Sequence, residues 1–230
     1  MSSASRDTAT AIGLSFVAGF VDTLGFIALF GLFTAHVTGN FVLIGAALST
    51  AAGQAGLIAK LLALPTFVLV AAGVTVLARR TQRSGGAISR RLISAQIILL
   101  ALFATLGWSS LPITDPDAAL PILAGLTGVG AMAVQNVAGR LAFSRIAPTT
   151  VMTGNVTQLV IDLVDGVGAV SETRSAALAN LRRLGGPVLA FALGAAAGAT
   201  GFALATFAAL TVPILLLCLI WTVSGQPKDV

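Results

Sequence analysis

The sequence has few charged residues, one cysteine, one histidine and no tyrosine, and each shortage excludes a class of site or fold. The single Cys218 excludes a disulfide framework and any metal site built from several cysteines. The single His36 leaves no second histidine for a paired-histidine metal site, so we expect no bound metal and no cofactor. The motifs HExxH and GxSxG and a phosphate-binding glycine loop are also missing, so we expect that the chain is not an enzyme.

Long apolar runs take the place of the missing charges. Hydrophobic residues make up 57% of the 230 residues, whereas charged residues make up only 9%. Five runs are long enough, at about 1.5 Å per helical residue, to cross about 30 Å of hydrocarbon. They cover residues 11–33, 61–78, 92–108, 118–134 and 185–223. The lack of tyrosine and of alternating segments disfavours a transmembrane β-barrel, so the sequence predicts a single all-α polytopic membrane domain over residues 1–230.

The positive net charge of +5 does not indicate a nucleic-acid partner. The basic residues cluster at the ends of the apolar runs, as membrane topology requires, and are not interleaved with aromatic residues. We therefore expect the lipid bilayer, and no nucleic acid, as the surroundings of this chain. Five arginines lie in the segment 79–91, which the positive-inside rule places in the cytoplasm.

The tripeptide Thr-Gly-Asn occurs twice, at residues 38–40 and 153–155. Each copy opens a short apolar run, over residues 41–48 and 156–164 respectively. As helices these runs cover only about half of a bilayer. We therefore expect each tripeptide to start a half-helix.

The similarity of the two halves continues outside the tripeptides. The stretch around Asp22, GFVDTLGF, aligns with the stretch around Asn136, AVQNVAGR. The sequence therefore predicts two repeats, which cover about residues 11–111 and about residues 118–223.

The distribution of basic residues decides between two topologies. If both short runs cross the membrane, there are eight helices in two parallel four-helix repeats, with seven basic residues inside and six outside. If both runs enter and leave on one side, six transmembrane helices remain, and all thirteen basic residues except Lys60 lie inside. The second topology is favoured. It gives two inverted three-span repeats with the N- and C-termini in the cytoplasm, an arrangement that many transporters and some channels use.

The two tripeptides are the first candidate site. Their glycines would allow a sharp turn into the membrane, and their threonines and asparagines would cap the free N–H groups of each helix start. Such a helix start attracts an anionic group. These candidates are Thr38, Gly39, Asn40, Thr153, Gly154 and Asn155. The competing interpretation is that they cap buried helix breaks and contact no solute.

Asp22 is the strongest candidate for coupling to protons or cations. It lies near the middle of the first apolar run, where an unpaired carboxylate is costly enough to be protonated or partnered. The alternative is that a protonated Asp22 donates one structural hydrogen bond to another helix. His36 lies beside the first tripeptide, where it could titrate near neutral pH or simply form a hydrogen bond.

Three further polar residues are candidates for contact with a solute. Gln135 and Asn136 lie deep in their apolar run, and we expect them opposite Asp22 as hydrogen-bonding groups. Asp162 shares a helix face with Asp165 one turn later. The two carboxylates line a vestibule or form the solvated side of an interfacial helix, and the sequence does not favour either interpretation.

The stretch GFVDTLGFIALFGLFTAHVTGNFVLIGAAL in the first half and the phrases AVQNVAGR and PTTVMTGNVTQL in the second resemble the YoaK family of bacterial integral membrane proteins, a domain of unknown function. The resemblance covers nearly the whole chain. It implies a location in the bacterial cytoplasmic membrane, and it implies no substrate or site.

These observations lead to one functional hypothesis and two alternatives. We expect a small secondary transporter of a small polar or anionic solute, coupled to protons, with its site between the two half-helix starts. The alternatives are a channel and a membrane scaffold or partner subunit that transports nothing. Because six spans in 230 residues make a narrow bundle, we also expect a homodimer, with the glycine-rich segment 194–201 as its contact.

Overall fold

The computed structural model describes residues 3–49, 55–83, 88–168 and 171–224. These residues form eight α-helices and one short 3₁₀ helix, η1, and no strand, so the all-α prediction is confirmed. The helices are α1 (Ser3–Ala28), α2 (Gly39–Ala47), α3 (Leu57–Arg83), α4 (Ile88–Ser109), α5 (Ala119–Leu141), α6 (Met152–Gly168), α7 (Ser171–Ala205), η1 (Thr206–Leu210) and α8 (Thr211–Val223). The centre of the basic segment 79–91, residues 84–87, and Lys228 lie outside the described residues.

Five segments of the described chain are long and apolar enough to cross a membrane, so the chain has the segments of a multi-pass membrane protein. They are Ser5–Ala28, Leu57–Thr81, Ile88–Ser109, Ala119–Leu141 and Arg174–Val223. The last segment, with 50 residues, contains α7, η1 and α8. The chain reverses at η1, where Thr206 has a left-handed φ of 49°.

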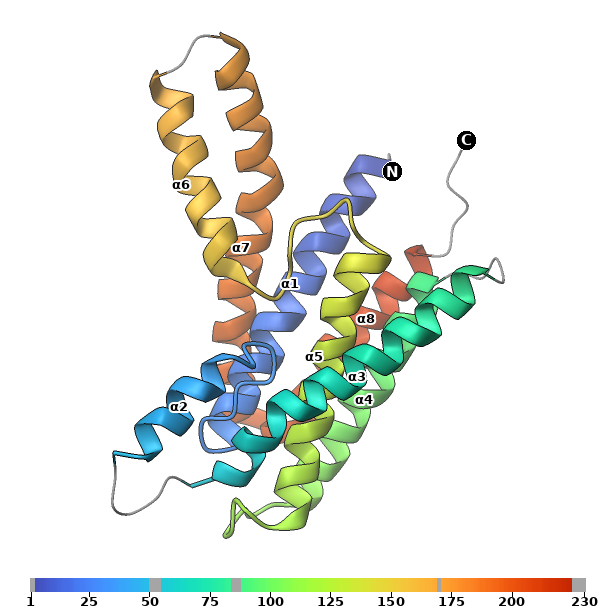
Figure 1. Ribbon diagram of the computed structural model, residues 1–230, viewed down its shortest axis with the longest axis vertical. Helices are drawn as coiled ribbons and strands as arrows, with labels where there is room; N and C mark the ends of the chain where they lie inside the picture. The colour runs from blue at the N-terminus through green and yellow to red at the C-terminus, as the bar shows by residue number, and fades with distance from the viewer. Residues whose placement is uncertain (1–2, 50–54, 84–87, 169–170, 225–230) are drawn as a thin grey trace.

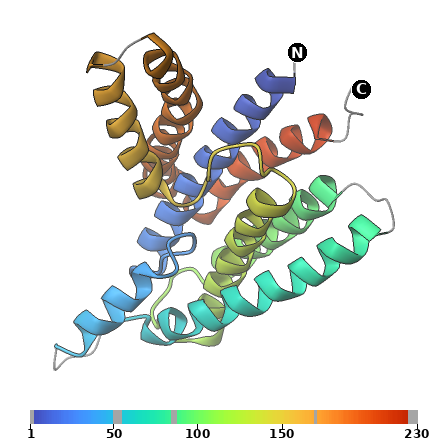
Figure 2. The same cartoon turned by 45° about the horizontal axis from the view of Figure 1, so that its top comes forward.

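The directions of the helices follow a simple pattern in Figure 1. Helices α1, α4 and α7 run downward in that view, and α3, α5 and α8 run upward. The starts of α1 and α4 and the ends of α3, α5 and α8 therefore lie toward the same end of the bundle. The short helix α2 leaves the bundle downward, whereas α6 leaves it upward and pairs with the first half of α7 (Figures 1 and 2).

The closest packing in the chain joins α1 to α7. Gly194 and Gly198 of α7 lie directly on the main chain of Phe16 and Phe20 of α1, where a Cβ on either glycine would overlap a carbonyl oxygen. These two glycines therefore form a surface that allows two helices to pack closely. Because α1 of the same chain covers this surface, it cannot be the dimer contact that we expected, and the homodimer itself stays a prediction.

Of the two short helices, α2 has the predicted length and α6 is longer than predicted. Helix α2, with nine residues, has the length of the expected half-helix. Helix α6 has 17 residues, because it starts four residues before the apolar run 156–164 and continues four residues beyond it. Its partner α7, with 35 residues, also includes the basic residues Arg174, Arg182 and Arg183.

Candidate functional site

The connection between α1 and α2, residues 29–38, turns back along α1. Phe30 and Gly31 make the turn with left-handed φ values of 54° and 90°. The glycine that the reversal requires is therefore Gly31, and not Gly39 as predicted from the tripeptide. Gly39 instead leaves room for the ring of Phe33, since a Cβ there would lie 2.9 Å from the ring carbon Cδ2. The turn places residues 34–36 beside Asp22, in the last two turns of α1.

Asp22 is the residue of α1 that this loop covers. Its side chain is buried, with an exposed fraction of 5%, yet its carboxylate accepts hydrogen bonds at both oxygens. The Oδ1 atom accepts from the main-chain N–H groups of Thr34, Ala35 and His36, at 2.8, 2.7 and 3.4 Å. It also accepts from the Thr34 hydroxyl at 3.3 Å. Asp22 is therefore partnered, as predicted, by a loop that donates to it and not by a neighbouring helix.

His36 completes the surroundings of this carboxylate. Its Nδ1 atom lies 2.6 Å from Asp22 Oδ2, and 35% of its side chain is exposed. The ring packs edge-on against Phe33 of the same loop and Phe191 of α7, with centroid distances of 6.2 and 5.7 Å. The hydrogen bond to Asp22 raises the pKa of His36 above its ordinary value, although partial burial acts in the opposite direction. The pair therefore stays charged to a higher pH than a free histidine would.

Asn40 fixes the loop from the start of α2. Its Oδ1 atom accepts from Phe33 N–H at 3.0 Å, and its Nδ2 atom donates to Phe33 O at 2.9 Å. The prediction that Thr38 and Asn40 cap α2 is therefore wrong, because Thr38 makes no side-chain capping bond and Asn40 faces backward. The physical reason is the apolar surroundings, in which the main-chain groups of Phe33 need partners more than the exposed start of α2 does.

Lys60 is a functional candidate that the sequence analysis missed. It lies in the first turn of α3, its exposed fraction is 1%, and its Nζ atom donates to Phe30 O at 2.8 Å. It also donates to Ala55 O at 2.7 Å and to Gly56 O at 3.5 Å. Lys60 thus binds a main-chain carbonyl of the same loop whose main-chain N–H groups bind Asp22. The available signal was a lone lysine directly before the apolar run 61–78, four residues after Gly56.

The connection between α5 and α6, residues 142–151, is held by amide side chains. Gln135 is completely buried and donates to Leu14 O at 2.8 Å and to the Thr149 hydroxyl at 3.1 Å. Its Oε1 atom accepts from Gln96 of α4 at 2.7 Å. Gln135 therefore meets α1 at Leu14, eight residues before Asp22, which is about 12 Å along a helix.

Asn136 and Asn155 hold the same connection from its two ends. Asn136 accepts from the Thr150 hydroxyl at 2.7 Å and donates to Met132 O at 3.0 Å. Asn155 donates to Pro148 O at 2.8 Å. In the described part of the chain, no hydrogen bond joins Gln135 or Asn136 to Asp22, so the structure does not bring these three residues together. Their contact with a solute stays a prediction.

The second tripeptide lies inside α6 and makes no turn. Helix α6 begins at Met152, so Thr153, Gly154 and Asn155 belong to its first turn. Thr153 and Gly154 are exposed, and a Cβ on Gly154 would meet no atom within 4 Å. The predictions that Gly154 makes a sharp turn and that Thr153 caps a half-helix are therefore wrong, because the chain already reverses in residues 142–151.

Asp162 faces α7, and its contact with a solute stays a prediction. Its exposed fraction is 5%, and its Oδ1 atom accepts from Gln158 at 3.1 Å and from Asn180 of α7 at 3.5 Å. Its Oδ2 atom has no hydrogen-bond partner among the described residues. Asp165, one turn later, is exposed. Of the two acidic residues, only Asp165 is on a solvated side.

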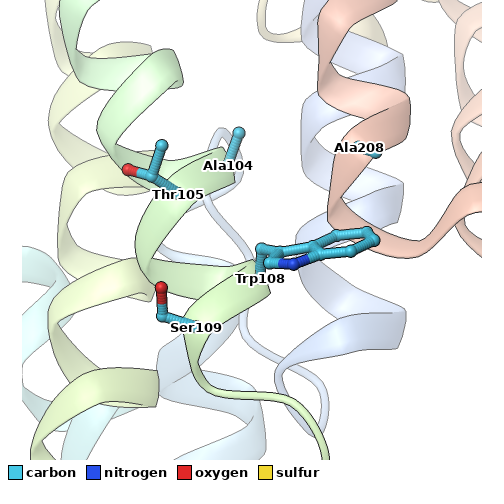
Figure 3. Close-up of a pocket in the computed structure, with 5 residues that line it drawn as sticks. All are labelled: Ala104, Thr105, Trp108, Ser109 and Ala208. Atoms are coloured by element: carbon cyan, nitrogen blue, oxygen red, sulfur yellow. The ribbon is translucent and has the colours of Figure 1, made fainter.

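An open groove lies elsewhere, between α4 and η1 (Figure 3). It has a volume of about 290 Å³ and is lined by Ala104, Thr105, Trp108, Ser109 and Ala208. The indole of Trp108 extends across it toward Ala208. None of the five lining residues is titratable or belongs to the predicted site, so the groove supplies no chemistry to Asp22.

The two connections use hydrogen bonds at matching offsets. Asn40 and Asn155 each bind the main chain of the residue seven positions earlier, Phe33 and Pro148 respectively. Asp22 binds His36, fourteen positions later, and Asn136 binds Thr150 at the same offset. Asp22 and Asn136, which align in sequence, thus also make corresponding hydrogen bonds in the structure.

Comparison with known proteins identifies a family and nothing more specific. The sequence model of a family described as "Protein of unknown function (DUF1275)" matches residues 10–223. Neither the curated proteins nor the solved structures gave a significant match. Since the match covers nearly the whole chain and agrees with the resemblance stated above, the chain belongs to this family of proteins of unknown function.

Proposed function

We propose that this chain is a small secondary transporter of a small polar or anionic solute, coupled to protons through Asp22. The observation that carries the proposal is the buried Asp22 carboxylate, paired with a partly exposed His36 inside the first apolar helix. Ionisable groups at such positions are expensive, and membrane proteins keep them mainly for proton relays and ion pathways.

The proposed location is the bacterial cytoplasmic membrane, with both termini in the cytoplasm. The direction of the helices supports it, because the N-terminus, the end of α3, the start of α4 and the end of α5 lie toward one end of the bundle. These are also the places of Arg6, Arg79, Arg80, Arg91 and Arg140. Six spans, α1, α3, α4, α5, α7 and α8, then leave one strongly basic side, as the positive-inside rule requires.

The proposed architecture is a pair of inverted repeats, α1 to α4 and α5 to α8. Its support is the opposite direction of equivalent helices, since α1 and α2 run downward in Figure 1 and α5 and α6 run upward. The matching hydrogen-bond offsets of Asn40 and Asn155 also support it. In transporters built this way, the irregular segments of the two halves surround the solute site and move against each other.

The proton would act on the bond between α1 and the loop. A neutral Asp22 accepts hydrogen bonds more weakly than a carboxylate, and it no longer attracts a charged His36. Protonation therefore loosens residues 34–36 from α1, and deprotonation pulls them back. Such a two-state element can expose a site alternately to the two sides of the membrane, provided that the solute binds the two states with different affinity.

Proteoliposomes loaded with a pH-sensitive dye test this proposal. Addition of chloride, nitrate, phosphate or pyruvate to separate samples should produce proton uptake with at least one anion, and the uptake should saturate with its concentration. Asp22→Asn should abolish the proton uptake, whereas Asp165→Asn, which neutralises an exposed carboxylate, should leave it unchanged.

The same assay separates the alternatives. Anion flux that does not saturate and does not respond to the proton gradient would indicate a channel. A folded protein that moves none of the anions, with or without Asp22, would contradict transport of this class of solute and favour a scaffold.

A further inference from the structure

The N–H groups of three successive residues, Thr34, Ala35 and His36, converge on one oxygen of Asp22. We call these three groups the amide nest. Successive main-chain N–H groups that point into one concavity bind anions in many proteins, and they recognise carboxylates in particular. The Thr34 hydroxyl and the His36 ring add donors to the same carboxylate, so five donors face its two oxygens.

We propose that the amide nest is the solute site, that it takes a small monocarboxylate, and that Asp22 occupies it as an internal substitute when no solute is bound. This inference rests on the proposed transport function and names its substrate class. The side chain of Asp22 ends in the same group as acetate or formate, so the nest already displays the contacts that such a solute would make.

The nest is held in place without Asp22. Asn40 binds both main-chain groups of Phe33, directly before the nest, and Lys60 binds the carbonyl of Phe30 at the turn. When the Asp22 side chain rotates away, these anchors keep the three N–H groups together. Buried N–H groups without an acceptor are unfavourable, so an external carboxylate is stabilised where Asp22 has left.

Charge explains why the solute should be a monoanion. Among the described residues, His36 is the titratable group in contact with Asp22, and Lys60 bonds the carbonyl side of the same loop. On α7, which packs against this region, Phe191 faces His36, and the nearest charged side chain toward its start, Arg183, is exposed eight residues earlier. One proton taken up by Asp22 and one carboxylate bound in the nest leave the net charge of the site unchanged, whereas a dianion adds an uncompensated charge.

The described residues of the second half offer no equivalent site. Asn136 stands where the alignment places Asp22, and the hydroxyl of Thr150, not a run of main-chain N–H groups, donates to its Oδ1 atom. The partly exposed side of His36 is where a solute would approach the nest.

Thermal unfolding of Asp22→Ala in detergent tests the nest without any flux measurement. The substitution removes a group of the size of formate, so sodium formate at about 100 mM should raise the Tm of the variant by about 3–8 °C over sodium chloride at equal ionic strength. Wild type and Asp22→Asn, whose nests are filled, should show no such rise near neutral pH. Absence of a formate-specific rise in Asp22→Ala, or an equal rise in Asp22→Asn, would overturn the inference.

A second measurement applies if Asp22→Ala does not accumulate. In Asp22→Ser, which also removes the carboxylate but keeps a small polar side chain, sodium formate should raise the Tm over sodium chloride at equal ionic strength. An equal effect of the two salts would overturn the inference. If formate stabilises the variant but no flux is found, the nest binds carboxylates and the proposed transport function is contradicted. If proton-coupled flux is found but formate does not bind, transport is supported and the nest is not its solute site.

Discussion

The two irregular connections follow similar rules with different chemistry. Residues 29–38 are held by two charged side chains, Asp22 and Lys60, whereas residues 142–151 are held by the neutral amides of Gln135 and Asn136. In both connections an asparagine binds the main chain seven residues earlier. The comparison separates the hydrogen-bond partners that any buried loop needs from the charged side chains that only the first loop uses.

A buried loop needs partners for its main-chain groups, and neutral amides are sufficient for that. The second connection shows this, since the side chain of Gln135 is completely buried and its hydrogen bonds are made to other protein groups. Charges in the first connection are therefore not required by the path of the chain. Because a buried charge is costly, the buried charged partners of the first connection, Asp22 and Lys60, support a functional role for that half.

The largest effect should come from a charge placed in the neutral connection. Asn136→Asp puts a carboxylate where the Thr150 hydroxyl is the donor, and the expected loss of stability is about 3 kcal/mol because an unpaired charge is left at a partly buried position. Thermal unfolding in detergent at about pH 8 measures it. Asn136→Ala, which removes the hydrogen bonds but adds no charge, should cost about 1–2 kcal/mol. Equal losses for the two variants would show that the second connection tolerates charge as well as the first does.

An intermediate difference should separate the two asparagines. Asn40 makes two hydrogen bonds to Phe33, whereas Asn155 makes one main-chain bond to Pro148, a residue without an N–H group. Asn40→Ala should therefore cost about 2 kcal/mol, and Asn155→Ala about 1 kcal/mol. Denaturation of the two variants in the same detergent compares them directly. If Asn155→Ala were the more damaging change, the first loop would depend on its charges and not on Asn40.

The smallest effect concerns pH. The pKa of His36 is raised in the folded protein, so the stability from its pair with Asp22 is fully present below the unfolded pKa of about 6.5 and is lost as pH rises through the folded pKa. For a pair of this kind we expect about 1 kcal/mol, or about 2–4 °C in Tm. The Tm of wild type should fall over this window, and that of His36→Gln should not. The same fall in His36→Gln would assign the pH dependence to another group.

The sequence predicted the class of the fold because hydropathy depends on composition, which is local. The apolar runs, the shortness of α2 and the pairing of Asp22 could all be inferred in this way. The reversal of residues 29–38 could not, because the tripeptide seemed to be the turn, whereas Phe30 and Gly31 make it. Nor could the backward reach of Asn40, since an asparagine near a helix start more commonly caps that helix.

Lys60 and Asp162 show a second limit. A lone lysine directly before an apolar run was assigned only a side of the membrane, and its three carbonyl partners come from two separate turns. Asp162 and Asp165 are equivalent in sequence, and only the packing of α6 on α7 buries one and exposes the other. Burial of this kind is decided by tertiary contacts, which a periodic pattern does not contain.

The glycine contact between α1 and α7 has a mechanical consequence. Where Gly194 and Gly198 lie on the carbonyls of Phe16 and Phe20, main chain touches main chain. Two such surfaces can slide along each other without any change of rotamer, as in shear motions of packed helices. Phe191, just before this contact, lies against the ring of His36. A small sliding of α7 along α1 would therefore move Phe191 away from the ring of His36 and change the surroundings of the Asp22–His36 pair. The glycine contact thus allows movement between two helices that it also holds close together.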